Sequence, residues 1–147
     1  MRLFSNNVKK MKVRNVLSLI LFIAYLGAVA YCCFGYFSDL PDVGSETFLG
    51  IPMDKVVHFI MFFPFPILCH LVFSGRARKR PYGTLISAGC VFLAGCAIAA
   101  ATEIGQYYTE YRSCDVKDFI ADCLALTLSS LVILGIETLI AKKRKQI

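Results

Sequence analysis

Ionisable side chains interrupt the apolar stretches of this 147-residue chain at helical spacing. Asp54 and His58 are four residues apart, so in a helix they share one face, with Lys55 on its flank. A carboxylate one turn from an imidazole orients the ring and stabilises its protonated form, as in an acid/base pair. The alternative is a structural hydrogen bond at a helix start.

Two further groups of polar residues follow. Glu103 and Gln106 share a face at the end of one apolar stretch, and Asp115, Asp118 and Asp122 form a stripe at the start of the next. These side chains indicate a polar site, or alternatively a buried clamp that fixes the helices. Between the two groups, Arg112 could hold a phosphate or carboxylate through two hydrogen bonds, or could neutralise the aspartates.

The candidate site therefore contains more acids than bases. The candidate catalytic residues are His58, Glu103 and Asp118; the candidate ligand-binding residues are Asp54, Lys55, His58, Glu103, Gln106, Arg112, Asp115, Asp118 and Asp122. An isolated phosphate is not the obvious ligand for such a set. The acids are partly protonated, pair internally, or accept an amine or a metal. The spacing matches no dedicated metal motif, so we expect no metal site and no cofactor.

Membrane-spanning helices are the elements that must position these residues. The chain is 57% apolar and 18% charged, against roughly 45–50% and 25% in soluble domains. Apolar stretches cover residues 16–37, 56–73, 82–107 and 119–140, and backbone in lipid must satisfy its own hydrogen bonds. We expect an all-α, transmembrane four-helix bundle forming a single domain over residues 1–147. A cleaved signal peptide is the alternative for the first stretch, but its apolar run continues far enough to span.

Basic residues predict the orientation. Most of the 16 Lys and Arg lie in residues 2–14, 76–80 and 142–145, and such stretches mark the cytoplasmic side. We therefore expect residues 1–15 and 141–147 to be cytoplasmic tails of an inner-membrane protein. The net charge of +6 then records orientation, and we expect no nucleic acid partner.

With this topology the three polar groups reach the outer face at one depth, His58 and Asp122 each about 6 Å below the residue one turn before it. Small residues continue the faces of Glu103 and Asp122 and predict that both acids face protein: Ala100, Ala99, Cys96 and Gly89 on one helix, Ala125 and Ser129 on the other. The sequence thus predicts a polar pocket open to the outside.

Two prolines follow His58 in the second stretch. Pro64 and Pro66 cannot donate backbone hydrogen bonds, which frees the carbonyl groups of Ile60 and Phe62 and predicts a kink. The freed carbonyls could form a polar floor under the pocket, or the kink could serve packing alone.

The remaining polar and sulfur-containing residues suggest no further site. Cys114 alone of seven cysteines lies in an outward link, so we expect no disulfide framework. We expect His70 to be a packing residue and Glu137 to reach the cytoplasmic interface.

Three motifs resemble the VanZ-like family of small bacterial membrane proteins. They are Asp54-Lys55-x-x-His58-Phe59, Glu103-x-x-Gln106 and Arg112-x-x-Asp115-x-x-Asp118, within about residues 50–135. The family pattern often continues with Asn and then Gly, where this chain has Asp122 and Ala125.

The resemblance implies an integral protein of the cell envelope, similar to founding members linked to teicoplanin resistance, and no established reaction. We expect membrane lipids and a lipid-linked or glycopeptide-type envelope ligand as partners. The hypotheses are recognition or processing of that ligand, a membrane-embedded hydrolase or transferase, and a structural or assembly factor.

Overall fold

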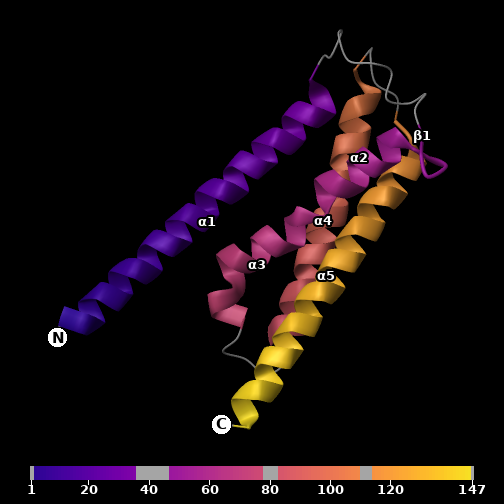
Figure 1. Cartoon of the computed structure of the whole chain (residues 1–147). Helices are drawn as coiled ribbons and strands as arrows, with labels where there is room; N and C mark the ends of the chain where they lie inside the picture. The colour runs from indigo at the N-terminus through magenta and orange to yellow at the C-terminus, as the bar shows by residue number, and fades with distance from the viewer. Residues whose placement is uncertain (1, 36–46, 78–82, 110–113, 147) are drawn as a thin grey trace.

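The computed structural model describes residues 2–35, 47–77, 83–109 and 114–146. Within these ranges the chain is almost entirely helical (Figure 1), which confirms the predicted all-α class. The elements are α1 (Arg2–Phe34), β1 (Thr47–Phe48), β2 (Ile51–Pro52), α2 (Met53–Phe62), α3 (Pro64–Ala77), α4 (Gly83–Tyr107) and α5 (Val116–Lys145). The two short strands form an antiparallel hairpin just before α2.

Four helical stretches in the described residues are long and apolar enough to cross a membrane: Asn15–Phe34, Met53–Phe73, Gly83–Tyr107 and Val116–Lys143. Their bounds differ from the predicted ones by a few residues, because charged side chains take part in the first helical turns. Asp54 and Lys55 lie inside α2, and Asp118 lies in the first turn of α5. The predicted amino-terminal tail is helical as well, since α1 begins at Arg2.

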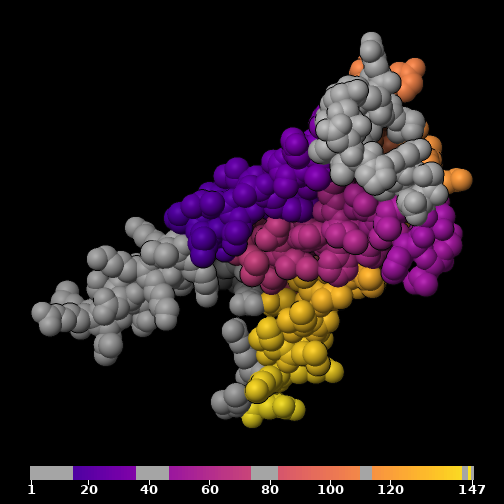
Figure 2. Space-filling view, turned by 45° about the horizontal axis from the view of Figure 1, so that its top comes forward, coloured from indigo at the N-terminus to yellow at the C-terminus, as the bar shows by residue number. Residues whose placement is uncertain are grey.

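The helices form a bundle in which α4 and α5 lie side by side. Helix α2 packs on α5, and α3 packs on α1, α4 and α5; the contact of α1 with α3 is seen in Figure 2. Both chain termini lie toward one end of the bundle, while the starts of α2 and α5 lie toward the other (Figure 1). The starts of α2 and α5 carry Asp54, Lys55, His58 and Asp118. The bundle therefore has a polar end, which is remote from the two chain termini.

The second span is divided at Phe63 into α2 and α3, next to the prolines that led to the predicted kink. The backbone of Phe63 itself keeps helical angles, and its N–H donates to the carbonyl of Phe59 at 3.0 Å. Pro64 opens α3, a position that needs no backbone N–H. The hydroxyl of Tyr25 on α1 donates to the carbonyl of Met61 at 2.8 Å. That carbonyl lies between the two that the sequence predicted to be freed, and a neighbouring helix supplies its partner.

Small residues bring α4 and α5 together. Ala99, Ala125 and Ser129 are fully buried, as predicted for the faces below Glu103 and Asp122. Gly89 is exposed, contrary to that prediction. It lies two heptads from Glu103, and a straight helix drifts by roughly 20° per heptad relative to a seven-residue repeat, which turns Gly89 away from the contact.

Candidate functional site

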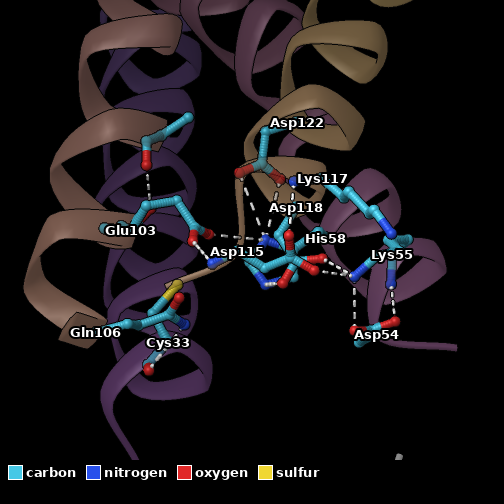
Figure 3. A network of polar contacts seen from close by, with 12 residues as sticks. Cys33, Asp54, Lys55, His58, Glu103, Gln106, Asp115, Lys117, Asp118 and Asp122 are labelled. Atoms are coloured by element: carbon cyan, nitrogen blue, oxygen red, sulfur yellow. Dashed lines mark hydrogen bonds and ion pairs between the residues drawn. The ribbon is translucent and has the colours of Figure 1, made fainter. Parts of the chain in front are cut away.

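The polar end of the bundle gathers seven of the predicted site residues into one network (Figure 3). Three elements supply them: the start of α2, the end of α4, and the start of α5 with the residue before it. They are Asp54, Lys55, His58, Glu103, Asp115, Asp118 and Asp122. The chain thus brings residues up to 64 positions apart into contact, from three separate spans.

Lys55 binds three carboxylates. Its ammonium nitrogen lies 2.8 Å from Asp54 Oδ2, 2.9 Å from Asp115 Oδ2 and 2.7 Å from Asp118 Oδ1. The Lys55 side chain is largely buried, and its stem crosses from α2 to α5. This ion pair network ties the start of the second span to the start of the fourth.

Asp115 forms the N-cap of α5, where its side chain accepts a hydrogen bond from the backbone N–H of Lys117 at 2.9 Å. The hydrogen bond from Lys55, together with this backbone N–H, lowers the pKa of Asp115 below its usual value. The backbone N–H of Asp115 in turn donates to Glu103 Oε2 at 3.1 Å. Asp115 therefore connects the end of α4 to the start of α5.

His58 is buried between carboxylates on both sides of its ring. Its Nδ1 lies 3.2 Å from Asp122 Oδ1 and 3.7 Å from Glu103 Oε1, and its Nε2 lies 3.8 Å from Asp118 Oδ2. The predicted pairing of His58 with Asp54 is not the arrangement found. Asp54 instead binds its neighbour Lys55 through both the backbone N–H and the ammonium group, and Asp122 reaches His58 from α5.

Glu103 is one of the most buried charged residues of the network, with 4% of its surface exposed. Its Oε2 accepts the hydrogen bond from Asp115, whereas its Oε1 accepts no hydrogen bond from the part of the chain that the structure describes. Buried carboxylate oxygens are rarely left in this state. Glu103 Oε1 therefore points to an additional partner in the site.

Of the predicted ligand-binding residues that the structure describes, Gln106 is not part of this network. Gln106 donates through its amide nitrogen to the carbonyl of Cys33 on α1 at 3.2 Å, so it links α4 to α1. Arg112 lies outside the described residues. The contacts of Gln106 fit the structural role that small polar groups have between membrane helices.

The network can support two kinds of chemistry. An imidazole between carboxylates can take up or release a proton, as a general acid or base does. Two sets of metal-ligating atoms also lie within 4.8 Å of one another: His58, Glu103 and Asp122, and separately Asp54, Asp115 and Asp118. The second set already holds the ammonium group of Lys55.

A second polar pair was missed by the sequence interpretation. His70 Nε2 lies 3.1 Å from Glu137 Oε1, joining α3 to α5. His70 also lines a cavity of about 20 Å³ together with Ser130, Ser87 and Thr84, enough for one water molecule. The available signal was that a histidine and a glutamate each interrupt an apolar run toward the same end of the bundle.

The structure describes all seven cysteines, and no disulfide joins any two of them. Cys96 on α4 and Cys123 on α5 have sulfur atoms 3.7 Å apart within the helix contact. Cys114 is exposed beside the N-cap of α5.

Residues 2–137 match the family model described as VanZ/LLP1. The match is wider than the resemblance in the sequence motifs, since it includes the first span. No curated protein matches the chain, and no solved structure does so.

Proposed function

Because the chain belongs to the VanZ/LLP1 family, we propose that its polar cluster recognises an envelope ligand at the outer face of the cytoplasmic membrane. This recognition affects susceptibility to glycopeptides such as teicoplanin. The polar cluster consists of the seven residues of the network described above: Asp54, Lys55, His58, Glu103, Asp115, Asp118 and Asp122. The ligand class is a lipid-linked or glycopeptide-type molecule of the envelope.

The orientation rests on charge. The basic stretches 2–14, 76–80 and 142–145 indicate the cytoplasmic side. The termini lie toward one end of the bundle, and the starts of α2 and α5 lie toward the other (Figure 1). Asp54, Lys55, His58, Asp118 and Asp122 of the polar cluster belong to these two helices. If the tails are cytoplasmic, the polar cluster faces outward, where envelope ligands are found.

One observation carries the proposal: charged groups from three spans meet at a single end of an otherwise apolar bundle. An acid in the hydrocarbon core costs roughly 2.5–3.5 kcal/mol on insertion scales. Asp122 is nevertheless fully buried, and Glu103 keeps an oxygen without a hydrogen-bond partner in the described residues. Such groups in membrane proteins favour a binding role over a purely structural one.

The test compares antibiotic susceptibility at matched membrane abundance. Glu103→Gln, His58→Ala and Asp118→Asn should each shift teicoplanin susceptibility to that of a strain lacking the gene. Glu137→Gln is the control, because it removes an acid from the opposite end of the bundle. Wild-type susceptibility in all three cluster variants would contradict the proposal.

A membrane-embedded hydrolase or transferase is a second candidate, favoured by the position of His58. Both of its ring nitrogens face carboxylates, with Glu103 and Asp118 as the acids that would assist it. Profiling of envelope lipids and precursors in deletion and overexpression strains separates the two, because an enzyme converts many substrate molecules per protein. If the profile of envelope lipids and precursors is unchanged while teicoplanin susceptibility changes, recognition without catalysis is the function.

A structural or assembly role is favoured by the ion pairs of Lys55, which tie α2 to α5. Under this hypothesis, substitutions in the polar cluster should lower the abundance of folded protein and the phenotype in proportion. Loss of phenotype at full abundance would exclude it.

A further inference from the structure

We propose that His58, Glu103 and Asp122 form a binding site for one divalent first-row transition metal ion. The candidate ligand atoms are one imidazole nitrogen and two carboxylate oxygens, all within 4.8 Å of one another. Each residue comes from a different helix: α2, α4 and α5. The proposal goes beyond the proposed function and does not depend on it.

The separations between these atoms suit a shared ion. His58 Nδ1 lies 3.2 Å from Asp122 Oδ1 and 3.7 Å from Glu103 Oε1. With metal–ligand bonds of about 2.0–2.2 Å, neighbouring ligands are about 3.0 Å apart around an octahedral ion and about 3.4 Å apart around a tetrahedral one. Both separations from His58 Nδ1 lie within a few tenths of an ångström of the tetrahedral value, and the two carboxylate oxygens lie within 4.8 Å of each other.

The unpartnered oxygen of Glu103 is an independent indication. Only 4% of the surface of Glu103 is exposed to solvent, and its Oε1 accepts no hydrogen bond in the described part of the chain. That oxygen is the atom that faces His58 Nδ1. A cation between them would supply the missing partner of a buried charge, which is costly to leave without one.

The surroundings of His58 match those of a metal-binding histidine. Such a histidine directs its second ring N–H at a carboxylate that fixes the ring. Here Nε2 faces Asp118 Oδ2 at 3.8 Å, and Lys55 holds the other oxygen of Asp118 at 2.7 Å. Lys55 also occupies the neighbouring acidic set, whereas no lysine or arginine in the described part of the chain forms an ion pair with Glu103 or Asp122.

The ligand types indicate the class of metal. Imidazole nitrogen suits zinc and related transition metals, while Ca²⁺ and Mg²⁺ prefer oxygen ligands alone. Two carboxylates and a dication sum to zero formal charge, which suits a buried position. Zn²⁺ and Mn²⁺ are therefore the probes of choice.

The experiment uses the full-length protein, purified in detergent and stripped with a chelator. Zn²⁺ or Mn²⁺ is added, unbound metal is removed, and the bound metal is measured by mass spectrometry alongside the thermal unfolding temperature. The wild type should retain about one equivalent and unfold at a higher temperature with metal. Glu103→Gln and Asp122→Asn should weaken binding by tenfold or more and remove the thermal shift.

Glu137→Gln is the matched control, because it alters the other histidine–carboxylate pair, which lies at the opposite end of the bundle. It should bind metal as the wild type does. A wild type that retains no metal, or Glu103→Gln protein that folds and binds as tightly as the wild type, would overturn the proposal. If both variants fail to fold, the stoichiometry and thermal shift of the wild type still decide. Metal uptake by the wild type, together with wild-type teicoplanin susceptibility in all three cluster variants of the earlier test, would refute the proposed function but not the metal site.

Discussion

At the residue scale, Lys55 governs the charge balance of the polar cluster. Its ammonium group forms ion pairs with three of the five acids of the cluster. Asp118 is the most buried of these three. An acid left without its counter-ion in a dry site is destabilising by about 3–5 kcal/mol, whereas an exposed pair contributes about 1 kcal/mol or less. The side chains of Asp54 and Asp115 are each more than a third exposed, so the loss of the Lys55–Asp118 ion pair accounts for most of the destabilisation.

We therefore expect Lys55→Met to lower the free energy of unfolding by about 2–3 kcal/mol, between the exposed and buried limits. Thermal unfolding of the purified protein in detergent measures this. Lys117→Met is the control, because Lys117 is an exposed lysine near the same helix start. Equal stability of Lys55→Met and wild-type protein would show that the network is not structural, and Lys55→Arg should restore most of the loss.

At the element scale, the close contact of α4 with α5 and α3 depends on a glycine. A Cβ atom built at Gly95 would lie 2.6 Å from Leu126 Cδ2 and 3.1 Å from Phe65 Cδ1. Leu126 and Phe65 are both buried in the core. These side chains must therefore shift if any residue larger than glycine occupies position 95.

We expect Gly95→Ala to destabilise the protein by about 1–3 kcal/mol through overpacking. Gly89→Ala is the matched control on the same helix, since a Cβ there meets nothing within 4 Å. Both substitutions gain similar helix propensity, so their difference in unfolding temperature isolates the packing contribution. A Gly95→Ala protein that is as stable as Gly89→Ala would contradict the close contact.

At the scale of the whole molecule, orientation decides which compartment the polar cluster meets. The apolar surface of the helices is broadly exposed in the described residues, with Leu93, Ile104, Leu124 and Leu131 each more than half exposed. These faces are suited to lipid, so the ends of the bundle remain for water and ligands. Cys114 lies at the end that carries the polar cluster.

We expect a membrane-impermeant maleimide to label Cys114 in intact cells or spheroplasts. The reason is that Cys114 is exposed next to the N-cap of α5, on the side predicted to face outward. Cys114→Ser should remove the labelling. Labelling of Cys114 that requires permeabilised membranes would reverse the proposed orientation.

The sequence alone determined the four spans and the gathering of polar groups at one end. Long uncharged stretches leave few structures other than membrane helices, and Pro64 and Pro66 required a break in the second. The spacing of Asp115, Asp118 and Asp122 likewise fixed them to the start of one helix. These are local properties, since hydrogen bonding in lipid and helical periodicity act over a few residues.

The tertiary structure decided the partners. Spacing within α2 predicted that Asp54 would face His58, but the rotation of α5 brings Asp122 to His58 while Lys55 takes Asp54. The candidate metal-ligating set was likewise invisible as a motif, because its three members come from three helices. Distances between side chains on different helices depend on crossing angle and rotation, which packing at residues such as Gly95 and Leu126 sets and which no local pattern encodes.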